Sequence, residues 1–246
     1  MEQTVSRSQL GFSLLSVTFL LCLTSGAFGS IDPDKLKAII DYIREYGIKN
    51  IHYAVAIRLD HAYCVEPTPT ILETVLPRSK MQQMKNALDH RNGIYVPKPI
   101  GDVIAARPRF TRSKEHAEWR LLTGGQNSPV ERILSNKDQN SCLIFFSKLS
   151  PCVERCLNES DARNIVQMVN PLFNRYSEDS RAFVFETVYM KDTVKEHEAV
   201  VGAWEHIQGA PLFRCYSNNR GCIKCFDDNQ SSDRNPCLGD EVETER

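Results

Sequence analysis

The apolar residues of this chain follow two spacings, one helical and one strand-like. A first helix is expected from Asp32, a good N-cap, to Gly47, a good C-terminal stop. Its apolar face consists of Leu36, Ile39, Ile40 and Ile43. The next segment, 51–59, is a short run of apolar and β-branched residues, which predicts a buried strand.

The region after this strand has weaker patterns. Prolines punctuate residues 61–92, within which 78–90 is compatible with a helix, and we interpret this region as an insertion over the core. A second strand is expected within 94–106, where Pro97 and Pro99 interrupt it.

From residue 113 onward, helices and strands alternate. Three helices are expected, at 113–122, 161–176 and 195–209. Three strands are expected, at 141–147, 181–190 and 211–216. A further helix is expected to begin at Pro151, because proline is favoured at the first helical position. This order predicts an α/β domain of three layers, in which helices flank a five-stranded mixed sheet.

Residues 1–29 have the pattern of a secretory signal peptide. A short start that contains Arg7 precedes an apolar, uncharged run, and small residues are spaced like a cleavage site before Ser30. A membrane anchor is the alternative, but the apolar run is short for a span and no basic stop follows it. We therefore expect an extracellular mature chain without membrane contact, with a domain at 30–218 and a cysteine-rich, acidic tail at 219–246.

The composition adds two constraints. The formal net charge of −1 does not indicate nucleic-acid binding, but residues 226–246 carry seven acidic and two basic side chains, so the rest of the mature chain is net positive. Eight cysteines remain after the signal segment, and an even number in an oxidising compartment favours disulfides. Sequons at Asn158 and Asn229 are candidate glycosylation sites on the same secretory route.

Three residues are of the types that form a catalytic zinc site, in which three protein ligands leave one position for water. They are His116, Cys152 and Cys156. On a helix, Cys152 and Cys156 would point about 40° apart, and a helix N-terminus stabilises thiolates. His116 lies near the start of its own helix, and both helices follow strands. Their N-termini can therefore meet at one edge of the sheet.

Glu118 is the candidate acid and base of such a site. Zinc lowers the pKa of its bound water to about 7, and a nearby carboxylate can take the proton and later deliver it to a ring nitrogen and to a leaving amine. In the middle of a helix the side chains of His116 and Glu118 would diverge by about 200°. The pair is therefore expected in the first turn, where both side chains can point past the helix end.

The ordered pair of His-Ala-Glu at 116–118 and Ser-Pro-Cys at 150–152 resembles the zinc-dependent cytidine deaminases, whose signature is H-x-E followed by P-C-x-x-C. The Ser-Pro-Cys run also resembles the AID/APOBEC branch. Here the second cysteine comes one residue later, as P-C-x-x-x-C, and the tryptophan that this branch has before Ser-Pro-Cys is absent.

The resemblance extends over roughly residues 32–217. Free-nucleoside deaminases join their last two strands by a hairpin, whereas the AID/APOBEC branch inserts a helix that makes the last strand parallel. The helix at 195–209 is similar to that inserted helix. With its signal peptide and cysteine-rich end, the chain most resembles the secreted AID/APOBEC-like deaminases of vertebrates, especially fish.

This resemblance implies a cytidine-deaminase-like fold and Zn²⁺ as the cofactor, held by His116, Cys152 and Cys156. It implies that Glu118 is catalytic, that the reaction is hydrolysis of cytosine to uracil, and that the protein has a role in immunity. Two other functions stay open, namely deamination of free cytidine or deoxycytidine, and a non-catalytic secreted binding protein that keeps the zinc site.

One basic stretch with an aromatic residue leads into His116. It consists of Arg107, Arg109, Phe110, Arg112 and Lys114. A solvated loop is the simplest interpretation, and a grip on phosphates at the mouth of the site is the functional one. Because a target base must leave its stack to reach a buried zinc, single-stranded nucleic acid is the expected substrate, with free cytidine as the alternative.

If Cys152 and Cys156 bind zinc, six cysteines are left for three disulfides. We expect Cys64–Cys142, because the end of the first strand would lie beside the start of the third if they are antiparallel neighbours. The other two disulfides would pair the tail cysteines in one of three ways. These are Cys215, Cys222, Cys225 and Cys237. The alternatives are a Cys152–Cys156 disulfide or redox pair, and a second zinc site in the tail.

The remaining aromatic residues and histidines give no functional pattern. Trp119 and Trp204 are expected in the core. No role is assigned to His52, His61, His90, His197 and His206.

Overall fold

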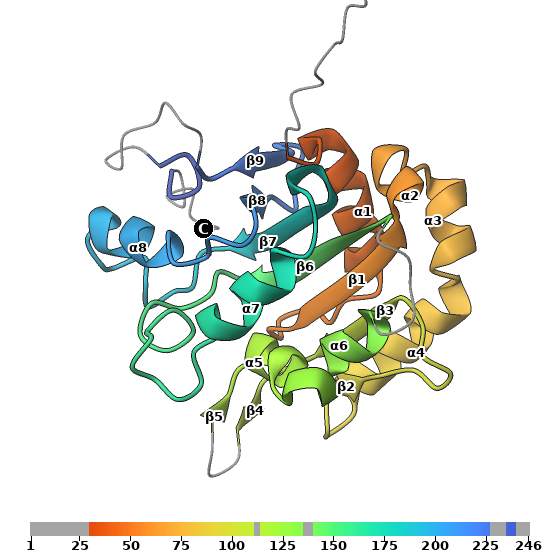
Figure 1. Ribbon diagram of the computed structural model, residues 1–246, viewed down its shortest axis with the longest axis horizontal. Coiled ribbons are helices and arrows are strands. Elements are labelled where there is room, and N and C mark those ends of the chain that lie inside the picture. Colours follow the sequence, from red (N-terminus) through yellow and green to blue (C-terminus); the bar gives the residue numbers. More distant parts are fainter. Residues whose placement is uncertain (1–29, 111–113, 135–139, 227–234, 240–246) are drawn as a thin grey trace, which may run out of the picture.

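A computed structural model describes residues 30–110, 114–134, 140–226 and 235–239 (Figure 1). The expected signal peptide, Arg112 and Asn229 lie outside these residues. Within them, no helix combines the length and the apolar character needed to cross a membrane.

The first helix, α1 (Pro33–Glu45), begins where the sequence predicts. The Oδ1 atom of Asp32 accepts hydrogen bonds from the backbone N–H groups of Asp34 and Lys35, at 2.9 and 3.1 Å. These bonds satisfy two of the donors that a helix N-terminus leaves without partners. The apolar face is fully buried, so this helix packs against the sheet as expected.

The sheet has seven strands, so the expectation of five was wrong. Their order in space is β2 (Ile94–Tyr95), β3 (Val103–Ala106), β1 (Ala54–Asp60), β6 (Ser141–Leu149), β7 (Arg181–Thr187), β8 (Leu212–Cys215) and β9 (Cys222–Lys224). The region 94–106 forms two strands rather than one, since Pro97 and Pro99 lie in the loop between them. The tail supplies β9, which pairs antiparallel with β8 at the other edge.

The strand directions agree with the expected mixed sheet. Strand β1 is antiparallel to both β3 and β6, whereas β6, β7 and β8 run parallel. Helix α8 (His197–Trp204) lies between β7 and β8 in the chain and allows the last long connection to be a parallel crossover. This confirms the inserted helix and the parallel strand that the resemblance implied.

Helices cover both faces of the sheet, which confirms the three-layer α/β architecture (Figure 1). One face packs against α1, α2 (His61–Val65), α3 (Pro69–Val75) and α4 (Arg78–Asp89). The other packs against α5 (Ala117–Leu122), α6 (Pro129–Leu134), α7 (Val166–Phe173) and α8. Val55 and Ile57 of β1 face the first layer, and Ala54 and Ala56 face the second, as strand alternation requires.

The region interpreted as an insertion is therefore helical and covers the core. The two tryptophans also pack as expected, since Trp204 is fully buried against Phe185 and Trp119 is partly buried against the same core. Single turns of 3₁₀-helix, η1 (Gly125–Asn127) and η2 (Glu178–Ser180), complete the connections.

The segment before α5 differs from the expectation of a helix that begins at residue 113. Residues Lys114–Glu115 form β5, which pairs antiparallel with β4 (Arg109–Phe110). This hairpin leaves the sheet and extends from the lower edge of the molecule in Figure 1. The helix then starts at Ala117.

Three disulfides form, and Cys64–Cys142 is the one that strand order predicted. The tail cysteines pair as Cys215–Cys222 and Cys225–Cys237, so they hold no second zinc site. Cys215 and Cys222 face each other in the register of β8 and β9.

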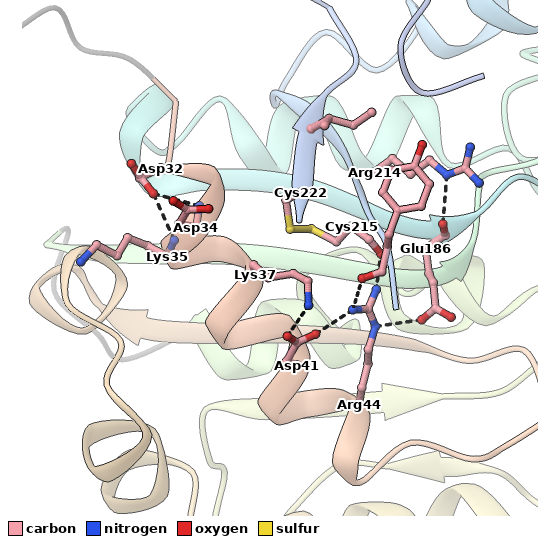
Figure 2. The surroundings of a disulfide bond; sticks show 12 residues. Asp32, Asp34, Lys35, Lys37, Asp41, Arg44, Glu186, Arg214, Cys215 and Cys222 are labelled. Carbon is pink, nitrogen blue, oxygen red and sulfur yellow. Dashed lines mark hydrogen bonds and ion pairs between the residues drawn. A yellow bond between two sulfur atoms is a disulfide. The ribbon is translucent and has the colours of Figure 1, made fainter. Parts of the chain in front are cut away.

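The hairpin of β8 and β9 is also joined to α1 through Arg44 (Figure 2). The guanidinium group of Arg44 donates to the carbonyl oxygens of Cys215 and Tyr216 and pairs with the Glu186 carboxylate at 2.8 Å. Arg214 of β8 donates to the carbonyl oxygen of Cys237 at 2.7 Å. The last part of the described chain is thereby packed onto the domain.

The disulfides should contribute unequally to stability, because the loop entropy lost by the unfolded chain grows with the number of residues enclosed. Cys64 and Cys142 are 78 residues apart, whereas Cys215 and Cys222 are 7 apart. Replacing both members of the first pair by alanine should lower the free energy of unfolding by about 4 kcal/mol, against about 2 kcal/mol for the second pair. Urea unfolding of the two variants measures the difference, and an equal or reversed loss would contradict this ranking.

Candidate active site

His116 is the N-cap residue of α5, with an extended backbone, and Glu118 lies in the first turn of that helix. The buried side chains of Ala117 and Leu121 pack this short helix against the hydrophobic core. The prediction that both polar side chains occupy the helix start is thus confirmed. Because His116 has an extended backbone and Glu118 lies in the helix, both side chains can line the same cavity.

Cys152 and Cys156 lie directly after β6, but the helix expected from Pro151 does not form. Residues 153–156 form hydrogen-bonded turns instead. Two backbone donors are taken by side chains: Val153 N–H donates to Oδ2 of Asp192 at 3.1 Å, and Cys156 N–H to Sγ of Cys152 at 3.4 Å. The carbonyl oxygen of Cys152, which in a helix would accept from Cys156 N–H, accepts from Leu157 N–H at 3.1 Å, so a wider turn replaces the helical pattern.

The loop brings three potential metal ligands together. The Nδ1 atom of His116 is 3.1 Å from Sγ of Cys156 and 3.6 Å from Sγ of Cys152, and the two sulfur atoms are 3.4 Å apart. Zinc–sulfur bonds of about 2.3 Å and zinc–nitrogen bonds of about 2.0 Å in a tetrahedron place such atoms roughly 3.5–3.8 Å apart. The cluster thus fits a single ion, and its members are a group that could hold a metal.

The two cysteines form no disulfide, although the other six cysteines of the described chain all do. A hydrogen bond from the Cys156 thiol, together with the His116 ring, outweighs burial and lowers the pKa of Cys152 to about 5. The same hydrogen bond and the burial of Cys156 raise the pKa of its own thiol. The first proton of this pair of thiols is therefore lost more readily than the second.

Glu118 is almost completely buried beside this cluster. Its Oε1 atom accepts a hydrogen bond from the Ser147 hydroxyl group at 2.6 Å and lies 3.3 Å from Nε2 of His52. Burial alone would raise its pKa, but the charge and hydrogen bond of His52 and the hydrogen bond of Ser147 lower the pKa to about 2. The other oxygen, Oε2, has no hydrogen-bond partner among the described residues.

His52 and Ser147 were not among the predicted site residues, although the alternation of side chains along their strands indicates that both face the core. Ser147 has the same parity along β6 as Leu143 and Phe145, which pack toward α5. His52 has the same parity as Ala54 and Ala56 of β1, which pack on that face too. A polar side chain on the core-facing side of a strand needs a polar partner in the core. The partner of both Ser147 and His52 is Glu118.

Residues of the candidate site line a small cavity of about 120 Å³. Its lining includes His116, Glu118, Cys152 and Cys156, together with apolar atoms of Leu149 and other residues. The cavity therefore joins the four residues predicted for the active site.

The basic stretch 107–114 is only partly brought to the site. Phe110 lines the small cavity, and Arg107, Arg109 and Phe110 line a larger cleft of about 760 Å³ next to it. Lys114 is exposed on β5 opposite Phe110 and does not line either space.

A comparison with protein-family profiles matched residues 33–241 to the family described as Secreted Novel AID/APOBEC-like Deaminase 1. The chain belongs to this family. A search of curated proteins and a search of solved structures each found no match. The matched range includes all of the elements that position the candidate site, from α1 to the Cys225–Cys237 disulfide.

Membership in this family confirms the expected AID/APOBEC-like deaminase and the expected secretion. The three disulfides agree with an extracellular protein, because such bonds persist in oxidising surroundings. The exposed Asn158 stays a predicted glycosylation site.

The cysteine arrangement predicts two free thiols in the secreted protein. If mature protein is unfolded without reductant in the presence of a chelator, iodoacetamide should modify two cysteines per chain, Cys152 and Cys156. Mass spectrometry of the peptides measures the modified positions. A peptide that contains a Cys152–Cys156 disulfide would exclude the metal site.

Proposed function

We propose that this secreted deaminase is a zinc-dependent hydrolase that converts cytosine to uracil, with single-stranded nucleic acid as its substrate. The observation that carries the proposal is the convergence of His116, Cys152 and Cys156 with the Glu118 carboxylate in one small cavity. Each component has a separate chemical task in the hydrolysis of an amidine carbon–nitrogen bond.

His116, Cys152 and Cys156 would hold the zinc ion and leave its fourth position open. A zinc ion bound there supplies a Lewis acid that lowers the pKa of a water molecule to about 7 and so makes it a nucleophile at neutral pH. The carboxylate of Asp192 accepts a hydrogen bond from the N–H of Val153 and so helps to fix the loop that carries both cysteines.

Glu118 would move the protons. The hydroxyl group of Ser147 and the ring of His52 fix Oε1, which leaves Oε2 to exchange protons with the reactants. Glu118 takes a proton from water as the oxygen adds to C4 of cytosine, and delivers it to N3. The proton of the hydroxyl group now on C4 then passes through Glu118 to the amino group, so that the C4–N4 bond breaks, ammonia leaves and the C4 carbonyl of uracil forms.

The position of the cavity favours a base that is not stacked. The groups that would act on C4 are buried, so a target base has to enter the cavity alone, and single strands allow this at least cost. Helix α8 and the parallel β8 support a polynucleotide substrate by their similarity to the AID/APOBEC branch. The alternatives are free cytidine as the substrate and a non-catalytic binding role.

The metal assignment predicts one zinc per chain. Replacing His116 by alanine removes one of three ligands and should reduce bound zinc at least tenfold, since the two cysteines cannot complete a catalytic site alone. His197→Ala, at the exposed start of α8, is the matched control and should keep its metal. Metal analysis of the purified proteins measures the ratio, and undiminished zinc in the His116 variant would refute the assignment.

The acid–base assignment predicts that Glu118→Gln keeps zinc but loses turnover by about 10²–10⁴-fold, because the amide cannot shuttle a proton. Glu131→Gln, which removes a carboxylate that pairs with Arg175 on the surface, should stay active. Uracil formation is measured in parallel on cytidine, single-stranded DNA and single-stranded RNA. Activity on cytidine alone supports the free-nucleoside alternative, and no activity on any substrate supports the non-catalytic one.

A further inference from the structure

The large cleft beside the cavity is formed by three separate segments, residues 50–52, 90–92 and 107–110, and we call it the outer cleft. It shares His52, Pro108 and Phe110 with the small cavity of the active site, so the two spaces adjoin. Its volume of about 760 Å³ is more than six times that of the small cavity. A molecule that enters the small cavity can therefore continue into the outer cleft.

The outer cleft is strongly basic. Its lining contains Arg91, Arg107 and Arg109, and none of its described lining residues is acidic. The carboxylate of Glu115 compensates Arg109 through two hydrogen bonds of 2.8 and 2.9 Å. No ion pair with a described residue compensates Arg91 or Arg107. Two guanidinium groups thus stay available to an anionic ligand.

The wall that carries these arginines is held in place from the catalytic helix. Arg120 lies on α5, two residues after Glu118, and is buried. Its guanidinium group donates to the carbonyl oxygens of Asn92, at 2.9 Å, of Gly93, at 3.2 Å, and of Arg107. One side chain thereby ties the turn after α4 and the end of β3 to the helix of the active site.

Gly93 fixes the course of Arg107 across this wall. Its φ angle is +55°, and a side-chain Cβ atom there would lie 2.2–2.6 Å from the aliphatic part and Nε of Arg107. The N–H of Arg107 donates to the carbonyl oxygen of Gly93 at 2.8 Å. The absence of a side chain at position 93 is what allows the stem of Arg107 to cross the turn.

We propose that the outer cleft binds the phosphodiester backbone of the nucleotides that flank the target base, with Arg91 and Arg107 as phosphate contacts. Guanidinium groups match phosphate in charge and geometry. Phe110 is 75% exposed at the junction of the two spaces and offers its ring to a neighbouring base. The inference rests on the proposed function, and it assigns a binding role to the turn at the end of α4, which the sequence analysis treated as part of an insertion.

Arg91 is the sharpest position for a test, because it is exposed and its replacement leaves the core unchanged. Lys80→Glu is the matched control, since Lys80 is exposed on the preceding helix, α4, outside the cleft, and its replacement changes the net charge equally. The probe is a fluorescent 15-residue oligothymidylate. It has no cytosine, so its binding reports backbone contacts whether or not the protein deaminates anything.

Arg91→Glu should weaken oligothymidylate binding by about tenfold at low salt and reduce the slope of log affinity against log salt by about one unit. Arg91→Lys should recover most of the affinity, and Lys80→Glu should bind like the wild type. On substrates, Arg91→Glu should raise the KM for a cytosine-containing oligonucleotide, whereas Lys80→Glu should leave this KM unchanged.

The proposal is overturned if the wild type does not bind oligothymidylate, if Arg91→Glu binds like the wild type, or if Lys80→Glu loses as much affinity. It is also overturned if a sulfated heparin hexasaccharide, which has a similar charge, binds more tightly than the oligonucleotide, which would assign the cleft to glycans. Failure of the deaminase proposal would give a different result. No substrate would yield uracil, but Arg91→Glu would still bind oligothymidylate more weakly than the wild type.

Discussion

The contact of His116 with Cys152 and Cys156 joins the start of α5 to the loop that follows β6. These two segments are far apart in the chain, and they meet because β3, which precedes α5, and β6 both end near Ala54, at the same end of the sheet. Without a cation, the site would hold a histidine and two buried thiols within 3.1–3.6 Å and no disulfide between them. The three side chains form a group that could hold a metal ion, and we propose that a bound ion stabilises this arrangement.

The buried carboxylate of Glu118 depends on the same arrangement. A buried charge is costly unless other groups compensate it, and here Ser147 and His52 do so at one oxygen. Their effect is to keep the group ionised, and therefore able to accept a proton, in a place where burial alone would protonate it. Helix α5 carries Arg120 as well as Glu118, so one short helix positions both the candidate acid–base group and the wall of the outer cleft.

Much of this could be read from the sequence, because the strongest signals are local. The N-cap at Asp32, the alternation of helices and strands, and the H-x-E and P-C pair predicted the three layers and the site residues. The helix expected at Pro151 does not form, since the N–H of Cys156 donates to the Cys152 sulfur and the Cys152 carbonyl accepts from Leu157 instead. The contacts of His52, Ser147 and Arg120 depend on tertiary placement, which spacing along the chain does not encode beyond the parity of a strand.

The central claim is that His116, Cys152 and Cys156 hold one catalytic zinc ion beside Glu118. X-ray absorption spectroscopy of the zinc-loaded, secreted protein tests it most directly, because it counts the sulfur and the nitrogen or oxygen ligands around the metal. Two sulfur ligands at about 2.3 Å and two lighter ligands at about 2.0 Å are expected. A shell of four sulfur atoms, or one without sulfur, would contradict it.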